Sequence, residues 1–501
     1  MKEAVKRVLI VILGIVLQFG IMIYIQLFLN QYIGIFSLIY WILGVLIVLG
    51  ILKNSTRLSS YLPWIIFILL FPVFGTITFI TLGTSYKRSK LLKYLTKKNN
   101  EYAKYLEQGK LDDDVLIEND LLRYFNNYAK FPITTNNKVT YYDMGEKFYP
   151  ELLKELKKSK KFIFMEYFII NKGKMWDGIL DILKEKAKNG IEVRIMYDDM
   201  GSVTMLPENY NKELEKYNIK CIPFNKLSPF GGIMMNNRDH RKMTIIDGKV
   251  AFTGGLNISD EYINLTHPHG DKWKDNAIKI VGDSIWNLTV MFLTMWNATQ
   301  EEDSDILKFK YDFSNDNIKN DGYIVPYGNS PLLINSIGED VYLNIINSAK
   351  KYLYIFTPYL IIDTDMINSL TRAAKRGVDV RIIVPGVPDK KIIYGVTKSF
   401  FNVLMKDGVK IYTYTPGFMH SKVFISDDIR AVVGTLNLDY RSLYLHFENG
   451  IYLENNSEIK VIKKDLENSL QESKLVDKKG NKHNFINEVW QAILRLIAPL
   501  M

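Results

Sequence analysis

Two segments of the chain carry the same set of chemically active residues at the same spacing. In each segment a histidine is followed two positions later by a lysine, and then by an aspartate, a glycine and an asparagine. The first segment holds His240, Lys242, Asp247, Gly254 and Asn257, and the second holds His420, Lys422, Asp427, Gly434 and Asn437. The chain has only six histidines in 501 residues, so two matching copies at equivalent points of an internal repeat are not a chance pattern.

The chemistry that these sets favour is transfer of a phosphoryl group. Because the histidine and lysine are two positions apart in strand-like sequence, both would project from one face of a strand. The turn that follows would then bring the asparagine back toward them. One histidine could attack phosphorus while the other protonates the departing oxygen. The predicted phosphate-binding residues are Lys242, Asn257, Lys422 and Asn437.

A catalytic set is predicted from the histidine, lysine and aspartate of each copy. Its members are His240, Lys242, Asp247, His420, Lys422 and Asp427. The aspartates have an alternative role as turn formers, since each falls where a hairpin should turn. No metal or other cofactor is predicted, because each set brings a lysine that repels cations. The pair His267 and His269 lacks a third metal ligand at recognisable spacing, and there is no Walker-type loop or Gly-x-Ser-x-Gly elbow.

Two carboxylates downstream of the motifs are candidates to orient the histidines. An attacking imidazole must be neutral and held in one tautomer, normally by a carboxylate on its other nitrogen. Asp275 follows the first motif and Glu448 follows the second. We therefore predict that Asp275 orients His240 and that Glu448 orients His420, with a solvated surface carboxylate as the alternative for each.

The elements around the motifs are themselves duplicated. Ser159–Ile170 and Ala349–Ile362 are buried-strand patterns, and each leads through a helical stretch to a glycine, Gly190 or Gly377, before a second apolar strand. Strand, helix and strand in this order indicate a parallel or mixed sheet covered by helices. We therefore predict an α/β fold with a duplicated domain. The predicted units are a linker at 87–135, a first domain at 136–315 and a second domain at 316–501.

The first 86 residues form a predicted membrane region. No charged residue or histidine occurs from 8 to 52 or from 58 to 86, and a membrane-spanning helix needs about 20 apolar residues. The predicted transmembrane helices are 8–29 and 33–52, followed by a third apolar stretch at 62–82 that Pro72 and Gly75 interrupt. This third stretch is either a span or an interfacial or re-entrant segment.

Charge distribution indicates where the catalytic domains lie. Lysines and arginines collect before the first predicted span, between the second and third apolar stretches, and after the third. With two true spans, all three clusters would be cytoplasmic, so we predict a multi-pass protein of the cell membrane with its catalytic domains on the cytoplasmic face. The net charge of +10 fits phosphate-bearing partners without choosing among them. A single cysteine, Cys221, excludes an internal disulfide.

The duplicated His-x-Lys-x4-Asp-x6-Gly-x2-Asn pattern resembles the motif of the phospholipase D superfamily at every named position in both copies. Segments such as "GVDVRIIVPGVPDKK" and "TLNLDYRSLYLHFE" are similar to the bacterial cardiolipin synthase family. The resemblance implies two tandem α/β/α sandwich domains forming one active site, and metal-free phosphatidyl transfer through a phosphohistidine. It further implies that His240 attacks and that His420 acts first as acid and then as base. Asp275 and Glu448 correspond to the histidine-orienting carboxylates of the family.

The function that this resemblance implies is cardiolipin synthesis. Phosphatidylglycerol would give its phosphatidyl group to His240 and release glycerol, and a second phosphatidylglycerol would accept the group to form cardiolipin. Phosphatidylserine synthase and hydrolytic phospholipase D share the motifs and are the alternatives within the superfamily. The membrane segments disfavour a nuclease, so nucleic acid is not an expected partner. Intact motifs disfavour a silent lipid-binding scaffold, and the oligomeric state stays open.

Overall fold

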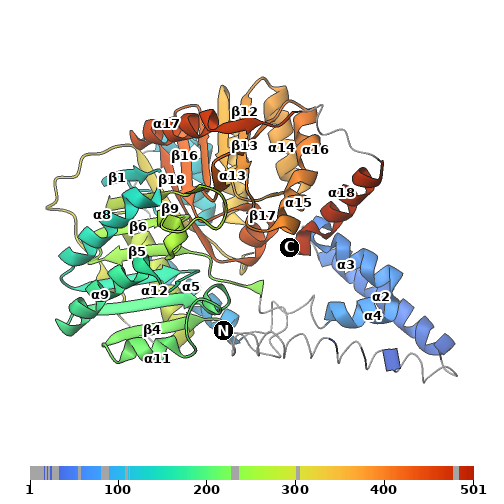
Figure 1. Cartoon of the computed structure of the whole chain (residues 1–501), viewed down its shortest axis with the longest axis horizontal. Coiled ribbons are helices and arrows are strands. Elements are labelled where there is room, and N and C mark those ends of the chain that lie inside the picture. The colour runs from blue at the N-terminus through green and yellow to red at the C-terminus, as the bar shows by residue number, and fades with distance from the viewer. Residues whose placement is uncertain are drawn as a thin grey trace.

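The computed structural model describes most of the chain after the first 32 residues (Figure 1). The described residues are 16, 20, 23–24, 33–54, 58–80, 90–107, 111, 113–226, 236–300, 305–333, 335–477 and 485–500. Two large sheets organise this part of the chain, one built from each copy of the sequence repeat.

The first sheet has seven strands in the order β1-β8-β6-β5-β2-β3-β4. Its strands are β1 Asn137–Tyr142, β2 Phe162–Tyr167, β3 Glu192–Asp198, β4 Ile219–Phe224, β5 Lys242–Ile246, β6 Val250–Gly254 and β8 Ala277–Gly282. Its helices are α8 Gly145–Lys158, α9 Lys174–Lys188, α10 Asp199–Ser202, α11 Tyr210–Glu215 and α12 Ile285–Gln300. Strands β2, β3 and β4 are parallel, whereas β5, β6, β8 and β1 pair antiparallel. The sheet is therefore mixed, which is one of the two types that the strand–helix–strand pattern predicted.

The second sheet has eight strands in the order β19-β13-β12-β10-β15-β16-β18-β9. Its strands are β9 Tyr323–Asn329, β10 Tyr352–Phe356, β12 Asp379–Pro385, β13 Lys410–Tyr414, β15 Val423–Ser426, β16 Arg430–Gly434, β18 Glu448–Glu454 and β19 Ser473–Leu475. Its helices are α13 Ile337–Ser348, α14 Thr364–Lys375, α15 Lys391–Ser399, α16 Phe401–Lys406 and α17 Glu458–Gln471. Parallel β10, β12 and β13 join an antiparallel hairpin through β15, which repeats the plan of the first sheet.

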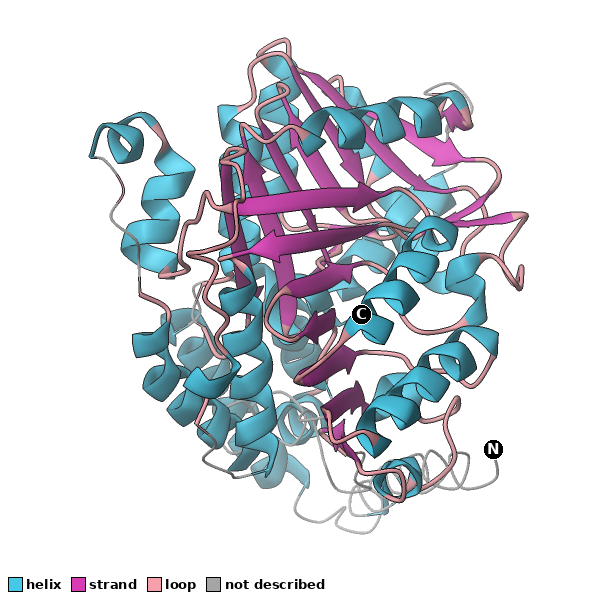
Figure 2. Ribbon diagram, turned by 90° about the vertical axis from the view of Figure 1, so that its left-hand side faces the viewer, coloured by secondary structure: helices cyan, strands magenta, loops and turns pink. Residues whose placement is uncertain are grey.

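The strands alternate their side chains between two hydrophobic layers. In β2, Phe162 and Phe164 belong to a core shared by both sheets, while Ile163 and Met165 face an outer core with α8 and α9. The shared core also contains residues of α12 and α17, and a third core packs α13 to α16 on the far side of the second sheet. Helices therefore lie on both outer sides of the paired sheets, with α8 and α9 at the left of Figure 1 and α14 and α16 at the right. Figure 2 shows the strands running between these helices.

A pair of short strands connects the two halves of the chain, and another pair lies within the second half. Strand β7 (Lys272–Lys274) of the first half pairs in parallel with β14 (Gly417–Met419) of the second half. Strand β11 (Leu360–Ile361) pairs with β17 (Leu438–Asp439) within the second half. The β7–β14 pair matters for the site, because each of its strands ends beside a motif residue or a predicted orienting carboxylate.

Apolar helices precede the sheets. They are α2 Ile33–Asn54, α3 Leu58–Leu70 and α4 Pro72–Thr78, and they pack on one another. Among the described residues, no helix is both long enough and apolar enough to cross a membrane. The predicted span at 8–29 lies almost wholly outside the described residues, and the one at 33–52 falls on α2. The predicted interruption at Pro72 is where α4 begins.

The remaining helices connect these parts. The segment before the first sheet holds α5 Lys90–Tyr102, α6 Asp113–Glu118 and α7 Asp120–Tyr124, and the chain closes with α18 Phe485–Ile497. Helix α5 packs on α12, and α18 lies against α15 and α3. Short 3-10 or π turns occur at Ala103–Tyr105, Phe125–Ala129, Asp260–Ile263, Leu307–Phe309, Arg441–Leu445 and Ala498–Leu500.

Candidate active site

The two motif histidines lie at the carboxyl ends of the parallel strands. Lys242, two residues after His240, pairs with Tyr167, the last residue of β2. Val423, directly after Lys422, pairs with Phe356, the last residue of β10. In α/β sheets this edge is where ligands commonly bind. The topology therefore brings both motifs to the equivalent edge of their sheets.

Each histidine is held in place by the backbone of the other half of the chain. The backbone N–H of His240 donates to the carbonyl of Phe447 at 2.9 Å, and Phe447 N–H donates to Arg238 at 2.8 Å. The N–H of His420 donates to the carbonyl of Lys274 at 2.7 Å, directly after the β7–β14 pair. These bonds fix the register between the halves at the two histidines.

The orienting carboxylates are crossed between the halves. His240 Nδ1 lies 2.9 Å from both carboxylate oxygens of Glu448, and His420 Nδ1 lies 2.5 Å from Asp275 Oδ2. Both carboxylates were predicted to orient histidines, but the predicted partners, Asp275 for His240 and Glu448 for His420, are wrong. The reason is the register: Glu448 follows Phe447, which pairs beside His240, and Asp275 follows Lys274, which pairs beside His420.

Each carboxylate has its own supporting group. The carboxylates of Glu448 and Asp275 are fully buried. Thr435 Oγ1 donates to Glu448, and the backbone N–H of Asn276 donates to Asp275 at 2.8 Å. The residue equivalent to Thr435 in the first copy is Gly255, where a Cβ atom would lie 2.0 Å from Asp275 Oδ1. The two copies thus differ at this position because one carboxylate needs a donor and the other needs space.

The two lysines are buried beside the histidines. Lys242 and Lys422 are each 1% exposed. Lys242 Nζ donates to the carbonyl of His240 at 2.6 Å, and Lys422 Nζ donates to the carbonyl of His420. Burial lowers the pKa of Lys242 to about 7 and that of Lys422 to about 8. A bound phosphate would restore the charge that burial disfavours, so these ammonium groups suit an anionic ligand.

The histidines are poised as neutral imidazoles. Burial lowers the pKa of His240 well below its ordinary value, and the charges of Lys242 and then Lys422 lower it further. Burial likewise lowers the pKa of His420 to about 4, with Lys422 adding to the effect and Asp275 opposing it. Charges of the second motif act on His240, so the two motifs share one electrostatic site. A neutral histidine that donates from Nδ1 leaves Nε2 unprotonated and able to attack.

The two motif asparagines are both buried but differ in their hydrogen bonds. Asn257 Oδ1 accepts from the backbone N–H of Ile169 at 3.0 Å, and its Nδ2 donates to the hydroxyl of Tyr262 at 2.7 Å. Asn437 Oδ1 has no hydrogen-bond partner within the described part of the chain. Phosphate binding by both asparagines stays a prediction, and Asn257 would have to release Tyr262 to offer its amide.

The motif aspartates lie at the opposite end of the strands. Asp247 has φ 54° and accepts from the backbone N–H groups of Lys160, Lys161 and Phe162 at 2.7, 2.6 and 2.9 Å. Asp427 has φ 57° and makes the same three bonds to the start of β10. Strands β5 and β15 run from the lysines to these turns, so the aspartates cannot reach the histidines. The turn-forming alternative replaces the catalytic role assigned to Asp247 and Asp427.

Replacing Asp247 with alanine is expected to lower stability without removing catalysis. The change leaves three backbone donors without their acceptor, which should cost about 1–3 kcal/mol in the free energy of unfolding. Turnover per folded molecule should stay within about threefold of wild type, since the turn does not touch the reacting groups. Chemical denaturation and turnover measured on the same preparation check this result. A loss of turnover in fully folded Asp247→Ala protein would restore the catalytic assignment.

A buried charged cluster next to His240 in the sequence was not predicted. Arg238 Nη1 lies 3.5 Å from Asp198 Oδ1, and Asp198 accepts from the N–H of Asp239 at 3.0 Å. Arg241 directly follows His240, and its Nη1 atom lies 3.7 Å from Glu166 Oε1. Burial raises the pKa of Asp198 to about 7. The run "NNRDHRK" was the available signal, because alternate charges flank the histidine on both sides.

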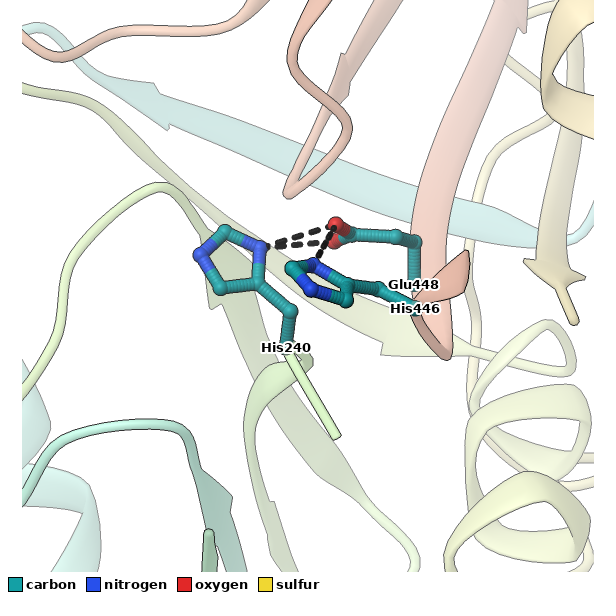
Figure 3. Close-up of side chains that lie close together, drawn as sticks. All are labelled: His240, His446 and Glu448. Carbon is teal, nitrogen blue, oxygen red and sulfur yellow. Dashed lines mark hydrogen bonds and ion pairs between the residues drawn. The ribbon is translucent and has the colours of Figure 1, made fainter. Parts of the chain in front are cut away.

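His446 is another residue of the site that was not predicted from the sequence. Its Nδ1 lies 3.7 Å from Glu448 Oε1, and its ring centroid is 5.5 Å from that of His240 (Figure 3). The ligand atoms of His240, His446 and Glu448 lie within 4.8 Å of one another and could hold a metal ion. However, Glu448 already accepts from His240 and Thr435, and Lys242 raises the positive charge nearby. The arrangement therefore suits proton control of His240 better than cation binding.

Comparison with known proteins is consistent with this geometry. The Haemophilus influenzae phosphatidylserine synthase structure superposes with a TM-score of 0.53 at 14% identity, covering 76% of this chain and 99% of that one. The likeness shows that the two chains share a fold. The family described as "Cardiolipin synthase, PLD-like domain" matches residues 152–283 and 342–470.

Full-length relatives extend the match over most of the chain. The cardiolipin synthase of Halalkalibacterium halodurans is 31% identical over 482 residues, covering 94% of each chain. That of Clostridium perfringens strain SM101 is 34% identical over 455 residues, covering 87% of this chain and 93% of the relative. An uncharacterized Streptococcus mutans protein is 41% identical over 460 residues, covering 91% and 99%. The chain belongs to the cardiolipin synthase family of phospholipase D-like proteins.

Proposed function

We propose that this protein is a cardiolipin synthase, a phosphatidyltransferase that makes cardiolipin and glycerol from two molecules of phosphatidylglycerol. The observation that carries the proposal is the pair of buried histidines, each bound through Nδ1 to a carboxylate of the other half. Two such histidines beside two buried lysines fit a two-step transfer of a phosphodiester. The family relatives named cardiolipin synthase support the choice of lipid.

In the first step His240 Nε2 attacks the phosphorus of phosphatidylglycerol. The bond between phosphorus and the glycerol oxygen breaks, and doubly protonated His420 gives its Nε2 proton to that oxygen, so glycerol leaves. The anionic phosphate favours this protonated form by offsetting the charges of Lys242 and Lys422. Glu448 stabilises the positive charge that develops on His240. We assign the attack to His240 from the family resemblance.

In the second step His420 acts as a base instead of an acid. It now accepts the proton of the primary hydroxyl of a second phosphatidylglycerol, whose oxygen attacks the phosphorus. The bond between phosphorus and His240 Nε2 breaks, which releases cardiolipin and returns both histidines to their starting states. Asp275 holds the Nδ1 proton of His420 through both steps.

The setting that we propose is the cell membrane, with the catalytic halves on the cytoplasmic face and helices within residues 1–86 as the multi-pass anchor. Apolar side chains of α2, including Leu38, Trp41 and Leu46, are exposed on the helix surface, which suits contact with lipid. The proposed units remain the linker at 87–135 and domains at 136–315 and 316–501. Phosphatidylglycerol and cardiolipin would be the lipids bound, without a role for nucleic acid.

The direct test supplies the purified full-length chain with phosphatidylglycerol alone and analyses the products. Cardiolipin and glycerol in equal amounts are the expected result. Phosphatidic acid and glycerol without cardiolipin would show a hydrolytic phospholipase D instead. Formation of phosphatidylserine on adding serine, with no cardiolipin in its absence, would identify a phosphatidylserine synthase.

Chelation should leave the reaction unchanged. Lys242 and Lys422 already supply positive charge to the phosphate, so a divalent cation has no necessary role in stabilising the transition state. Rates measured with and without an excess of EDTA, after dialysis against the chelator, should agree within experimental error. Activity that is lost to EDTA and restored by one particular divalent ion would contradict the metal-free mechanism.

A further inference from the structure

An exposed apolar face lies on α15, α18 and the loop before α15. We call it the docking face and define it by Val387, Ile392, Val489, Trp490 and Ile493, all of which are exposed. Ile392 is 70% exposed and Trp490 is 58% exposed. Large apolar side chains this open to solvent, grouped on adjacent elements, mark a site of interaction.

Helix α18 packs on α15 through one side of the apolar surface of α18. Leu494 is buried, and a Cβ atom at Gly395 of α15 would lie 3.7 Å from its Cδ1 atom. Val489, Trp490 and Ile493 extend the same apolar surface outward, since residues three and four apart share a helix face. The packing against α15 therefore uses only part of the apolar surface of α18, and the rest stays exposed.

The docking face continues to the rim of the active site. Val387 N–H donates to the carbonyl of Gly417, the first residue of the strand that leads to His420. Asp389 accepts from the hydroxyl of Tyr359 at 2.5 Å. Burial is the main cause of the low pKa of His240, and the charge of Lys390 adds to it. The loop at 386–390 thus connects α15 with the histidines.

In the opposite direction the docking face continues to the apolar N-terminal helices. Helix α18 contacts α3, and the final turn at Ala498–Leu500 contacts α3 as well. Figure 1 shows α18 beside α15, with α2, α3 and α4 next to it on the same side of the molecule. The exposed apolar side chains of α15 and α18 therefore lie on elements that contact α3 on one side and the loop at the active-site rim on the other.

The charges around Ile392 identify the kind of partner. Lys390 and Lys391 precede it, Lys398 lies at the other end of α15, and all three are exposed. Exposed lysines next to an exposed apolar side chain on α15 fit an anionic lipid surface, where apolar groups insert and lysines meet phosphates. A second copy of the chain would bring like charges together on this face, which disfavours self-association.

We propose that the docking face binds the surface of an anionic phospholipid bilayer and holds the active-site rim at the level of the lipid headgroups. The inference rests on the proposed function, because it supplies a route by which phosphatidylglycerol reaches the histidines without leaving the membrane. In this proposal the anchor proposed within residues 1–86 would hold the chain at the membrane, whereas the docking face would set the orientation of the catalytic halves.

The first test measures contact with lipid and needs no catalysis. Cys221 is buried, so a cysteine introduced at Ile392 can be labelled selectively with a polarity-sensitive dye in the full-length protein. In vesicles of phosphatidylglycerol and phosphatidylcholine, the dye at Ile392→Cys should be quenched by lipid-attached quenchers. The matched control is Ile429→Cys, at a position 42% exposed in the turn between β15 and β16, which should remain in water. A dye at position 392 that stays accessible to aqueous quencher in vesicles would overturn the proposal, as would shielding by a second copy of the chain.

The second test separates docking from chemistry. The double variant Ile392→Gln/Trp490→Gln should lose about tenfold in rate on vesicles, since vesicle binding scales with the apolar area inserted. Its rate on short-chain phosphatidylglycerol dispersed below its micelle concentration should stay within about twofold of wild type. Ile429→Gln should change neither rate. Equal loss on both substrates, or no loss on vesicles, would overturn the proposal. If wild type made no cardiolipin at all, the proposed function would fail while the dye measurement still decided the docking.

Discussion

Replacing either His240 or His420 with alanine is expected to abolish phosphatidyl transfer while the protein stays folded. Each variant removes a group that must form or break a bond to phosphorus or carry the proton, so turnover should fall by a factor on the order of 10⁴ or more. Both residues are only 7% exposed, but they lie at an edge of the sheets rather than within the hydrophobic cores. Circular dichroism and thermal unfolding should show the native fold.

The measurement is cardiolipin formation from phosphatidylglycerol, with His267→Ala as the matched control. His267 is an exposed histidine outside the motifs, so its loss should leave the rate unchanged. Turnover close to wild type in either motif variant would disprove the two-histidine mechanism.

Trapping the intermediate distinguishes the two histidines. Acid-quenched enzyme given radiolabelled phosphatidylglycerol should carry label on the peptide that contains His240. The variant His420→Ala should still acquire label slowly, with water protonating the departing glycerol, but should turn over poorly. Label on the His420 peptide of the wild-type protein would reverse the two roles.

The second large effect on turnover is expected when an amide replaces either of the crossed carboxylates, Glu448 or Asp275. Glu448→Gln should lower turnover by about 10³–10⁴-fold, because an amide can donate to His240 Nδ1 and so stabilises the tautomer that cannot attack. Asp275→Asn should act in the same way on His420. The exposed carboxylate variant Glu213→Gln is the control and should have no effect.

Single-turnover labelling shows which histidine each carboxylate serves. Crossed pairing predicts that Glu448→Gln slows formation of the labelled His240 peptide, since its partner is the attacking residue. Asp275→Asn should leave more label bound to the protein at late times, because the second step then lacks an effective base. The opposite assignment of the two defects would support pairing within each half.

Local sequence was sufficient for the repeated strands and helices and for the motif histidines and lysines. The strand–helix–strand repeat around Gly190 and Gly377 appears in the structure as β2-α9-β3 and β10-α14-β12, because hydrophobic runs and helix-ending glycines act over short distances. The repeated histidines and lysines indicated phosphoryl chemistry from residue type alone. His446 gave no such signal, since it has no counterpart in the repeated motif.

Contacts between distant segments could not be predicted in the same way. Asp275 is closer in sequence to His240 than to His420, so distance along the chain suggested the wrong partner. The actual partner depends on how β7 pairs with β14, and no local pattern encodes that register. Asp247 was misassigned for a related reason: a motif records which residues recur together, and it does not separate those that react from those that shape a turn.

The crossed pairing also limits how this gene can change. Each half of the chain encodes the carboxylate that the other half's histidine needs, so a half moved alone would carry a histidine without its carboxylate. A recombination breakpoint between residues 283 and 342 would join a histidine from one lineage to a carboxylate from another. The two halves, although similar in plan, must therefore match each other at these two contacts.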